Sequence, residues 1–129
     1  MQLKRVVVTG MGALTPIGNN LEAYWEGLRT GKSGSAPITY FDTEKFKTKF
    51  ACELKGYDSS DFFDRKEARK LDRFAQYALV SSDEAIADSG IDLDVVDKFK
   101  VGVIWGAGIG GLETFQNEVI NYANGDGTP

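Results

Sequence analysis

Two short apolar segments constrain the fold of this chain more than any other feature of its sequence. Val6–Val8 lie within the stretch Leu3–Thr9, and Phe99–Trp105 has the sequence Phe-Lys-Val-Gly-Val-Ile-Trp. Neither segment alternates strictly between apolar and polar residues, which is typical of strands covered on both faces. Sheets average about five or six strands. Two such strands in this chain therefore predict part of a larger sheet.

Three helical segments lie between and after these strands. The spacing of apolar residues predicts helices over Asn19–Gly31, Asp64–Gly90 and Leu112–Tyr122, and Asn19/Glu22 and Asp64/Glu67 have the spacing of a capping box. The remaining expectations are loops at Gly10–Gly18, Lys32–Pro37, Gly106–Gly111 and Asn124–Pro129, and a short edge strand at Phe50–Leu54. The order strand, helix, helix, strand, helix predicts an α/β fold with parallel pairing.

Composition excludes several classes of function. The chain has 129 residues, which is one domain at most, and a formal net charge of −4, which does not favour nucleic acid as a partner. It contains no histidine, so Ser-His-Asp catalysis, Cys-His catalysis and histidine-ligated metals are excluded within these residues. We expect no metal, no cofactor and no membrane partner. A single cysteine and no signal-peptide pattern at the N-terminus predict a cytoplasmic protein.

The single cysteine, Cys52, is predicted to be inert. A nucleophilic cysteine needs a nearby base or an electropositive site to form the thiolate. No histidine is available, and the adjacent Glu53 opposes thiolate formation.

The loop Gly106–Gly111 satisfies the pattern G-x-G-x-x-G after a strand and before a helix, as a dinucleotide-binding loop does. The acidic residue that would confirm this reading should lie about 20 residues further on, and the sequence ends before that position can be checked. The alternative is a glycine turn that lets the backbone pack closely against another element.

Five basic residues are concentrated within nine positions: Arg65, Lys66, Arg69, Lys70 and Arg73. On one continuous helix they fall within an arc of about 140°. Such a face is either simply solvated or a docking surface for an acidic partner.

Three segments together resemble one family. Arg5–Asn19 (Arg-Val-Val-Val-Thr-Gly-Met-Gly-Ala-Leu-Thr-Pro-Ile-Gly-Asn), Arg65–Phe74 (Arg-Lys-Glu-Ala-Arg-Lys-Leu-Asp-Arg-Phe) and Gly106–Leu112 (Gly-Ala-Gly-Ile-Gly-Gly-Leu) are similar to the first three signatures of bacterial β-ketoacyl-acyl-carrier-protein synthases. They occur in the family's order and at fitting separations, and the resemblance is closest to synthase II of fatty-acid elongation.

The resemblance implies a thiolase fold of five αβαβα layers, usually in a homodimer. It also implies decarboxylative condensation of a malonyl thioester with an acyl chain held on a cysteine, assisted by two histidines. None of these three catalytic positions lies in this chain, so residues 1–129 are expected to be an incomplete N-terminal portion with no catalytic residue.

The resemblance further assigns two sets of residues in this chain. Lys66, Arg69 and Lys70 match the family's bases that hold the acidic acyl carrier protein. Gly108 and Ile109 match its acyl-chain pocket, with Ile109 as a gate. Two alternatives stay open: a chain-length-factor-like partner subunit without a catalytic cysteine, and a nucleotide-binding module that uses Gly106–Gly111.

Overall fold

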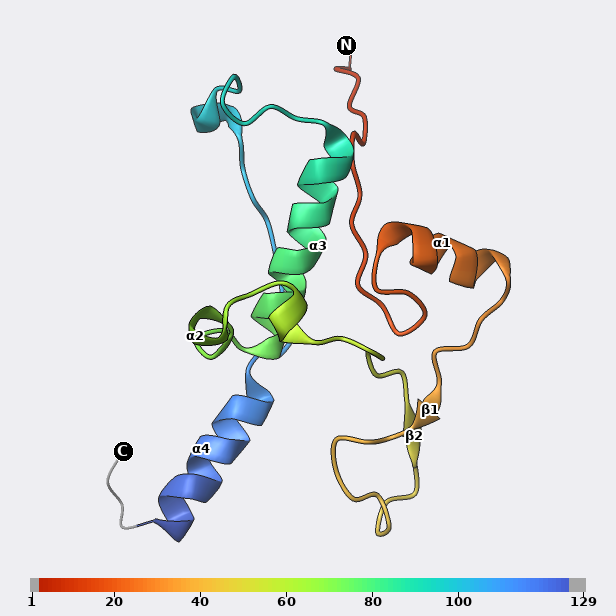
Figure 1. The fold of residues 1–129 in the computed structure, drawn as a ribbon, viewed down its shortest axis with the longest axis vertical. Helices are drawn as coiled ribbons and strands as arrows, with labels where there is room; N and C mark the ends of the chain where they lie inside the picture. The colour runs from red at the N-terminus through yellow and green to blue at the C-terminus, as the bar shows by residue number, and fades with distance from the viewer. Residues whose placement is uncertain (1–2, 126–129) are drawn as a thin grey trace.

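The computed structural model describes residues 3–125, and within them four α-helices provide most of the regular structure (Figure 1). The helices are α1 (Leu21–Arg29), α2 (Arg65–Ala68), α3 (Arg73–Ser89) and α4 (Leu112–Asn124). The strands are β1 (Ala36–Pro37) and β2 (Phe50–Ala51), and single 3₁₀ turns lie at η1 (Ser59–Asp61) and η2 (Lys98–Lys100). The long helix α3 is central, and the other elements are arranged around it (Figure 1).

The first helix forms where the apolar spacing predicts it, but its cap is one residue later than expected. Asn20, in an extended conformation, accepts a hydrogen bond from the backbone N–H of Ala23 at 2.8 Å. The Asn19 side chain instead donates to the carbonyl of Lys55 at 2.8 Å. Gly31 follows the helix with φ 67°, the left-handed conformation that favours glycine.

The expected continuous helix over Asp64–Gly90 is wrong, because it is divided into α2 and α3. Asp64 caps α2 as predicted and Gly90, with φ 64°, ends α3. Between them Asp72 has an extended backbone, with φ −60° and ψ 153°, so the chain turns there. The five basic residues therefore do not share one helical arc.

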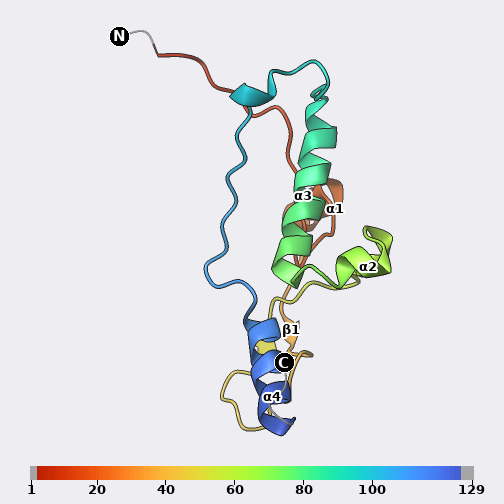
Figure 2. The same ribbon diagram turned by 90° about the vertical axis from the view of Figure 1, so that its left-hand side faces the viewer.

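The expected parallel sheet is also wrong for the part of the chain that the structure describes. Leu3–Thr9 and Val101–Trp105 are extended but belong to no strand ladder, and Phe99 lies in the turn η2. Figure 2 shows the segment after η2 running apart from α3. Val6 is 90% exposed and Ile104 is 98% exposed. Neither segment has the cover on both faces that its composition calls for.

One short antiparallel ladder does form, between β1 and β2. Ala36 pairs with Ala51 and Pro37 with Phe50, so the expected loop at 32–37 ends in a strand and the expected strand at 50–54 is only two residues long. Proline is tolerated because this ladder has only two strands, both of which are edges.

The last helix confirms the prediction for Leu112–Tyr122 and extends it by two residues. The loop expected at 124–129 falls mostly outside the described residues, since only Asn124, in α4, and Gly125, its C-cap, are described. Within residues 3–125 no apolar side chain is fully buried. No helix in this part of the chain has the length and hydropathy needed to cross a bilayer.

Candidate functional site

The turn between α2 and α3, the α2–α3 corner, is held by the buried side chain of Gln76. Its amide nitrogen donates to the carbonyls of Ala68 and Leu71, at 3.0 and 3.1 Å, and its amide oxygen accepts from the Tyr57 hydroxyl at 3.0 Å. In a continuous helix, each of these two carbonyls would accept a hydrogen bond from the backbone N–H four residues further along. Gln76, only 7% exposed, thus satisfies the backbone at the helix break.

Aromatic rings support Gln76 from one side. The Tyr57 ring stacks on Phe62 at 5.7 Å between ring centres and meets Tyr77 edge-on at 5.0 Å. Partial burial raises the pKa of Tyr57, and the neighbouring Asp58 carboxylate raises it further, against the opposing charge of Arg73. The phenol therefore stays protonated near neutral pH and can donate to Gln76.

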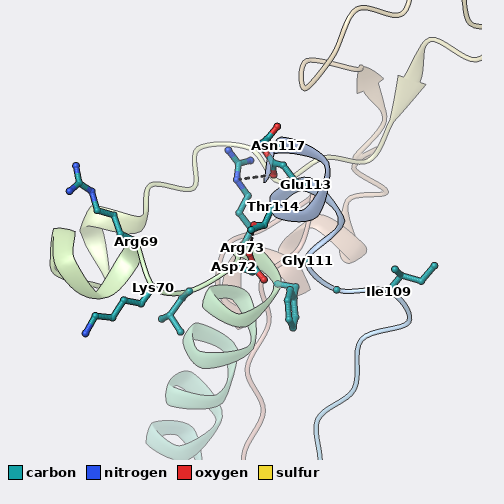
Figure 3. Close-up of a pocket in the computed structure, with 12 residues that line it drawn as sticks. Arg69, Lys70, Asp72, Arg73, Ile109, Gly111, Glu113, Thr114 and Asn117 are labelled. Atoms are coloured by element: carbon teal, nitrogen blue, oxygen red, sulfur yellow. Dashed lines mark hydrogen bonds and ion pairs between the residues drawn. The ribbon is translucent and has the colours of Figure 1, made fainter. Parts of the chain in front are cut away.

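The corner presents the three predicted docking residues to solvent. Lys66, Arg69 and Lys70 are exposed, and none of them forms an ion pair within residues 3–125. Figure 3 shows Arg69 and Lys70 extending away from α3 and α4. Their positive charges are therefore available to a partner.

Arg73, which the helical arc grouped with these bases, is used differently. Its guanidinium lies over the Tyr40 ring, 5.0 Å from the ring centre, and its Nε lies 3.7 Å from Glu113 Oε2 at the start of α4. Arg73 is also exposed, but its side chain contacts Tyr40 and Glu113, whereas Lys66, Arg69 and Lys70 form no ion pair within residues 3–125.

The loop Gly106–Gly111 lies against the start of α3 through its last two residues. A Cβ on Gly110 would lie 2.8 Å from the Phe74 ring, and a Cβ on Gly111 would lie 2.9 Å from Asp72 Oδ2. Gly111 also has φ 73°, which disfavours any other residue. Glycine at these two positions permits close packing against the start of α3. This is the role expected of a glycine turn rather than of a nucleotide-binding loop.

The charge at this loop also disfavours binding of a pyrophosphate. The start of α4 would be the anion-binding end of a dinucleotide site. Asp72 places a carboxylate there, and its Oδ1 accepts a hydrogen bond from the hydroxyl of Thr114 in the first turn of α4. An anion bound at this helix end would meet a fixed negative charge.

Gly108 and Ile109, the predicted acyl-pocket residues, lie in the part of the loop that does not contact α3. Ile109 is 76% exposed, and a Cβ on Gly108 would meet no atom within 4 Å. A pocket of about 510 Å³ nevertheless has Ile109 on one side and Arg69 and Lys70 on the other, with Asp72, Arg73 and Thr114 between them (Figure 3). The structure thus brings Arg69 and Lys70 from one predicted set and Ile109 from the other to the same pocket, while Lys66 and Gly108 do not line it.

The remaining candidate group is the single cysteine. Cys52 is exposed on the segment after β2, as an inert cysteine can be. Within residues 3–125 no three His, Cys, Asp or Glu side chains are grouped so that they could hold a metal ion.

Sequence reasoning missed the residues that hold the first glycine loop. A Cβ on Gly10 or Gly12 would overlap backbone atoms of α3. Asp88 accepts from the backbone N–H of Met11 at 2.9 Å, while Glu84 accepts from those of Ala13 and Leu21 at 2.8 and 2.7 Å. The available signal was the small residues Ser81, Ala85 and Ser89, spaced four apart, which allow a backbone to approach α3 closely.

Comparison with known proteins places the chain in a family. The family described as "Beta-ketoacyl synthase, N-terminal domain" matches residues 3–127. A 3-oxoacyl-[acyl-carrier-protein] synthase 2 from Synechocystis is 44% identical over 118 residues, which are 92% of this chain and 28% of the relative. Proteins of the same name from Staphylococcus aureus and Vibrio cholerae are 48% and 44% identical over 89% and 90% of this chain. The chain spans about 28% of the length of each of these relatives.

Two solved structures resemble the chain. One, the ishigamide ketosynthase/chain length factor, has a TM-score of 0.62 and 38% identity over 68% of this chain and 22% of that one. The other is a type II PKS acyl-carrier protein in complex with its ketosynthase, with a TM-score of 0.53 and 26% identity over 70% and 23%. The predicted α/β class is confirmed as that of the thiolase-like ketosynthases. Since the family match covers nearly all of its residues, the chain belongs to the β-ketoacyl synthases, in their N-terminal domain.

Proposed function

We propose that this chain is the N-terminal portion of a 3-oxoacyl-acyl-carrier-protein synthase of fatty-acid elongation. The relatives that share 44–48% of its residues carry that name. The chain has no histidine and one inert cysteine, so the catalytic cysteine and two histidines are contributed by the remainder of the synthase. That remainder covers the exposed segments Leu3–Thr9 and Val101–Trp105, and the complete enzyme is a cytoplasmic homodimer.

The reaction is condensation with loss of carbon dioxide. The acyl chain is held as a thioester on the catalytic cysteine. Decarboxylation of the malonyl thioester leaves a carbanion that attacks the acyl carbonyl. The new carbon–carbon bond replaces the bond to sulfur, and the cysteine sulfur leaves as a thiolate, which then takes up a proton from solvent. In this reaction the residues of this chain bind the carrier protein and select the acyl chain, and none of them forms or breaks a covalent bond.

Docking of an acidic acyl carrier protein is the specific role proposed for Lys66, Arg69 and Lys70. The observation that supports it is their exposure on a corner fixed by Gln76, as three cations that form no ion pair within residues 3–125. A fixed group of like charges steers an oppositely charged partner and speeds association. The solved ketosynthase in complex with a carrier protein supports this partner class.

Charge reversal in the complete synthase tests the docking surface. Each exposed contact contributes about 0.2–1 kcal/mol. Since reversal replaces attraction by repulsion, Lys66→Glu/Arg69→Glu should weaken carrier binding about tenfold at low salt, mainly through the association rate. The difference should shrink as added salt screens the charges.

The matched control is Lys45→Glu/Lys47→Glu, which makes the same change in net charge on the exposed loop between β1 and β2. It should leave carrier affinity within about twofold of the unmodified enzyme, as surface substitutions away from an interface do. Equal weakening by both double variants would show a general charge effect and remove the docking proposal.

A non-catalytic partner subunit is the second candidate, because one of the similar structures is a ketosynthase/chain length factor. The discriminating measurement is whether the complete protein becomes acylated on a cysteine by an acyl thioester. Acylation supports the synthase, and its absence in a folded protein supports the partner subunit.

A further inference from the structure

Asp72 occupies the N-cap position of α3 but does not cap that helix. Its backbone is extended, as an N-cap residue requires, yet its side chain makes no hydrogen bond to α3. Aspartate is among the preferred N-caps because its carboxylate accepts from the free N–H groups of the first turn. In this chain the carboxylate instead accepts from the Thr114 hydroxyl, 42 residues further along the sequence.

The Asp72 carboxylate lies at the start of a different helix, α4. Gly111 is the N-cap of α4 and has no side chain to cap it, and Thr114 is the third residue after it. The other oxygen of Asp72 lies 2.9 Å from where a Cβ on Gly111 would be. A negative charge at this end of α4 interacts favourably with the helix dipole. Asp72 therefore supplies to α4 the anionic group that its own N-cap lacks.

A second contact lies beside the first. Arg73 pairs with Glu113 at 3.7 Å, so two consecutive residues of the α2–α3 corner pair with two consecutive residues of α4 (Figure 3). Ile109 lies two residues before the start of this junction at Gly111, and Lys70 lies two residues before Asp72. The same junction thus bounds the glycine loop on one side and the basic corner on the other.

We propose that Asp72, through Thr114, is a positioning residue for the Ile109 gate. It holds the glycine loop against the corner that carries Arg69 and Lys70, so that the loop cannot yield when Ile109 rejects an acyl chain. This inference rests on the proposed function and on the gate role that the family resemblance implies for Ile109, because it needs an acyl chain at that residue. It assigns to Asp72 no contact with the reacting atoms.

A double-mutant cycle in the complete synthase tests the link between Thr114 and Ile109. Thr114→Val removes the hydroxyl at nearly constant size, and Ile109→Phe enlarges the gate. The quantity measured is the ratio of kcat/KM for a long acyl primer to that for a short one. The loss of this ratio caused by Ile109→Phe should be about fivefold smaller in the Thr114→Val background, the effect of one ordinary hydrogen bond.

Two further variants separate positioning from general stability. Thr114→Ser keeps the hydroxyl and should restore the full effect of Ile109→Phe. Glu118→Gln, an exposed change further along α4, should leave it unaltered. A merely structural role would lower activity on both primers alike and would leave the ratio unchanged.

The outcomes distinguish this inference from the function on which it rests. An equal selective loss from Ile109→Phe in both backgrounds would overturn the role of Asp72 and Thr114 and leave the synthase assignment intact. No selective loss from Ile109→Phe in the unmodified enzyme would overturn both the gate and the positioning role. No condensation by the complete protein would overturn the proposed function together with them.

Discussion

The chain has two glycine loops that each precede a helix and lie against α3, and the two are held in different ways. In the first, Gly10 and Gly12 lie against the backbone of α3, and the carboxylates of Glu84 and Asp88 bind backbone N–H groups. In the second, only Gly110 and Gly111 contact α3, while Gly106 and Gly108 have open space where a side chain would begin.

The difference shows that glycine content alone does not reveal what a loop does. The first loop is fixed along its length, so its glycines serve close packing. The second is fixed only where it enters α4, and it leaves Ile109 exposed before that point. A side chain that is to admit or reject a ligand must be accessible to it, as Ile109 is, whereas a loop that only spaces two elements has no such requirement.

The largest expected effect comes from adding a methyl group to the first loop. In the complete protein, Gly12→Ala places a Cβ against the carbonyl oxygen of Ser81 in the backbone of α3, where no side chain can yield. The free energy of unfolding should fall by about 3 kcal/mol or more, at or beyond the upper end of ordinary overpacking. The melting temperature checks this.

The matched change in the second loop is Gly108→Ala, which meets no atom within 4 Å and has no positive φ. It should alter the free energy of unfolding by less than about 1 kcal/mol. If the two alanine variants lowered the melting temperature equally, the structural distinction between the loops would be wrong.

A smaller loss is expected from removing the carboxylate that binds the first loop. Glu84 accepts from the backbone N–H groups of Ala13 and Leu21, and the second of these begins α1. Hydrogen bonds to charged groups contribute about 1.5–3 kcal/mol, so Glu84→Ala should lower the free energy of unfolding by about 2 kcal/mol.

The control for this change is Asp83→Ala, at an adjacent exposed position of α3. It should change the free energy of unfolding by less than about 0.5 kcal/mol. Chemical denaturation of both variants measures the difference, and equal destabilisation would show that Glu84 does not hold the loop.

Local signals predicted α1 and α4 well, because the apolar spacing that specifies each of them lies within the segment itself. The break between α2 and α3 has no proline or glycine to announce it. It depends on Gln76, whose partners are Tyr57, Ala68 and Leu71, and so on contacts that span up to 19 residues.

The two predicted strands, Leu3–Thr9 and Phe99–Trp105, were wrong for a different reason. Their composition indicated burial on both faces, and that cover is not formed within residues 3–125. Three of the predicted site residues, Arg69, Lys70 and Ile109, line one pocket, but Asp72 could not be singled out beforehand. An aspartate before a helix is ordinarily read as that helix's own cap, and only the fold shows its partner on α4.

The most direct test of the second loop's role is Ile109→Phe in the complete synthase, with kinetics on a short and a long acyl primer. Each buried methylene contributes about 0.8 kcal/mol, so a chain that loses four binding positions loses about 3 kcal/mol, roughly 100-fold in kcat/KM. Short primers do not extend to Ile109 and should keep most of their rate, with the melting temperature nearly unchanged. An equal loss on both primers, with a lower melting temperature, would instead show that Ile109 is a packing residue and that no gate exists at this loop.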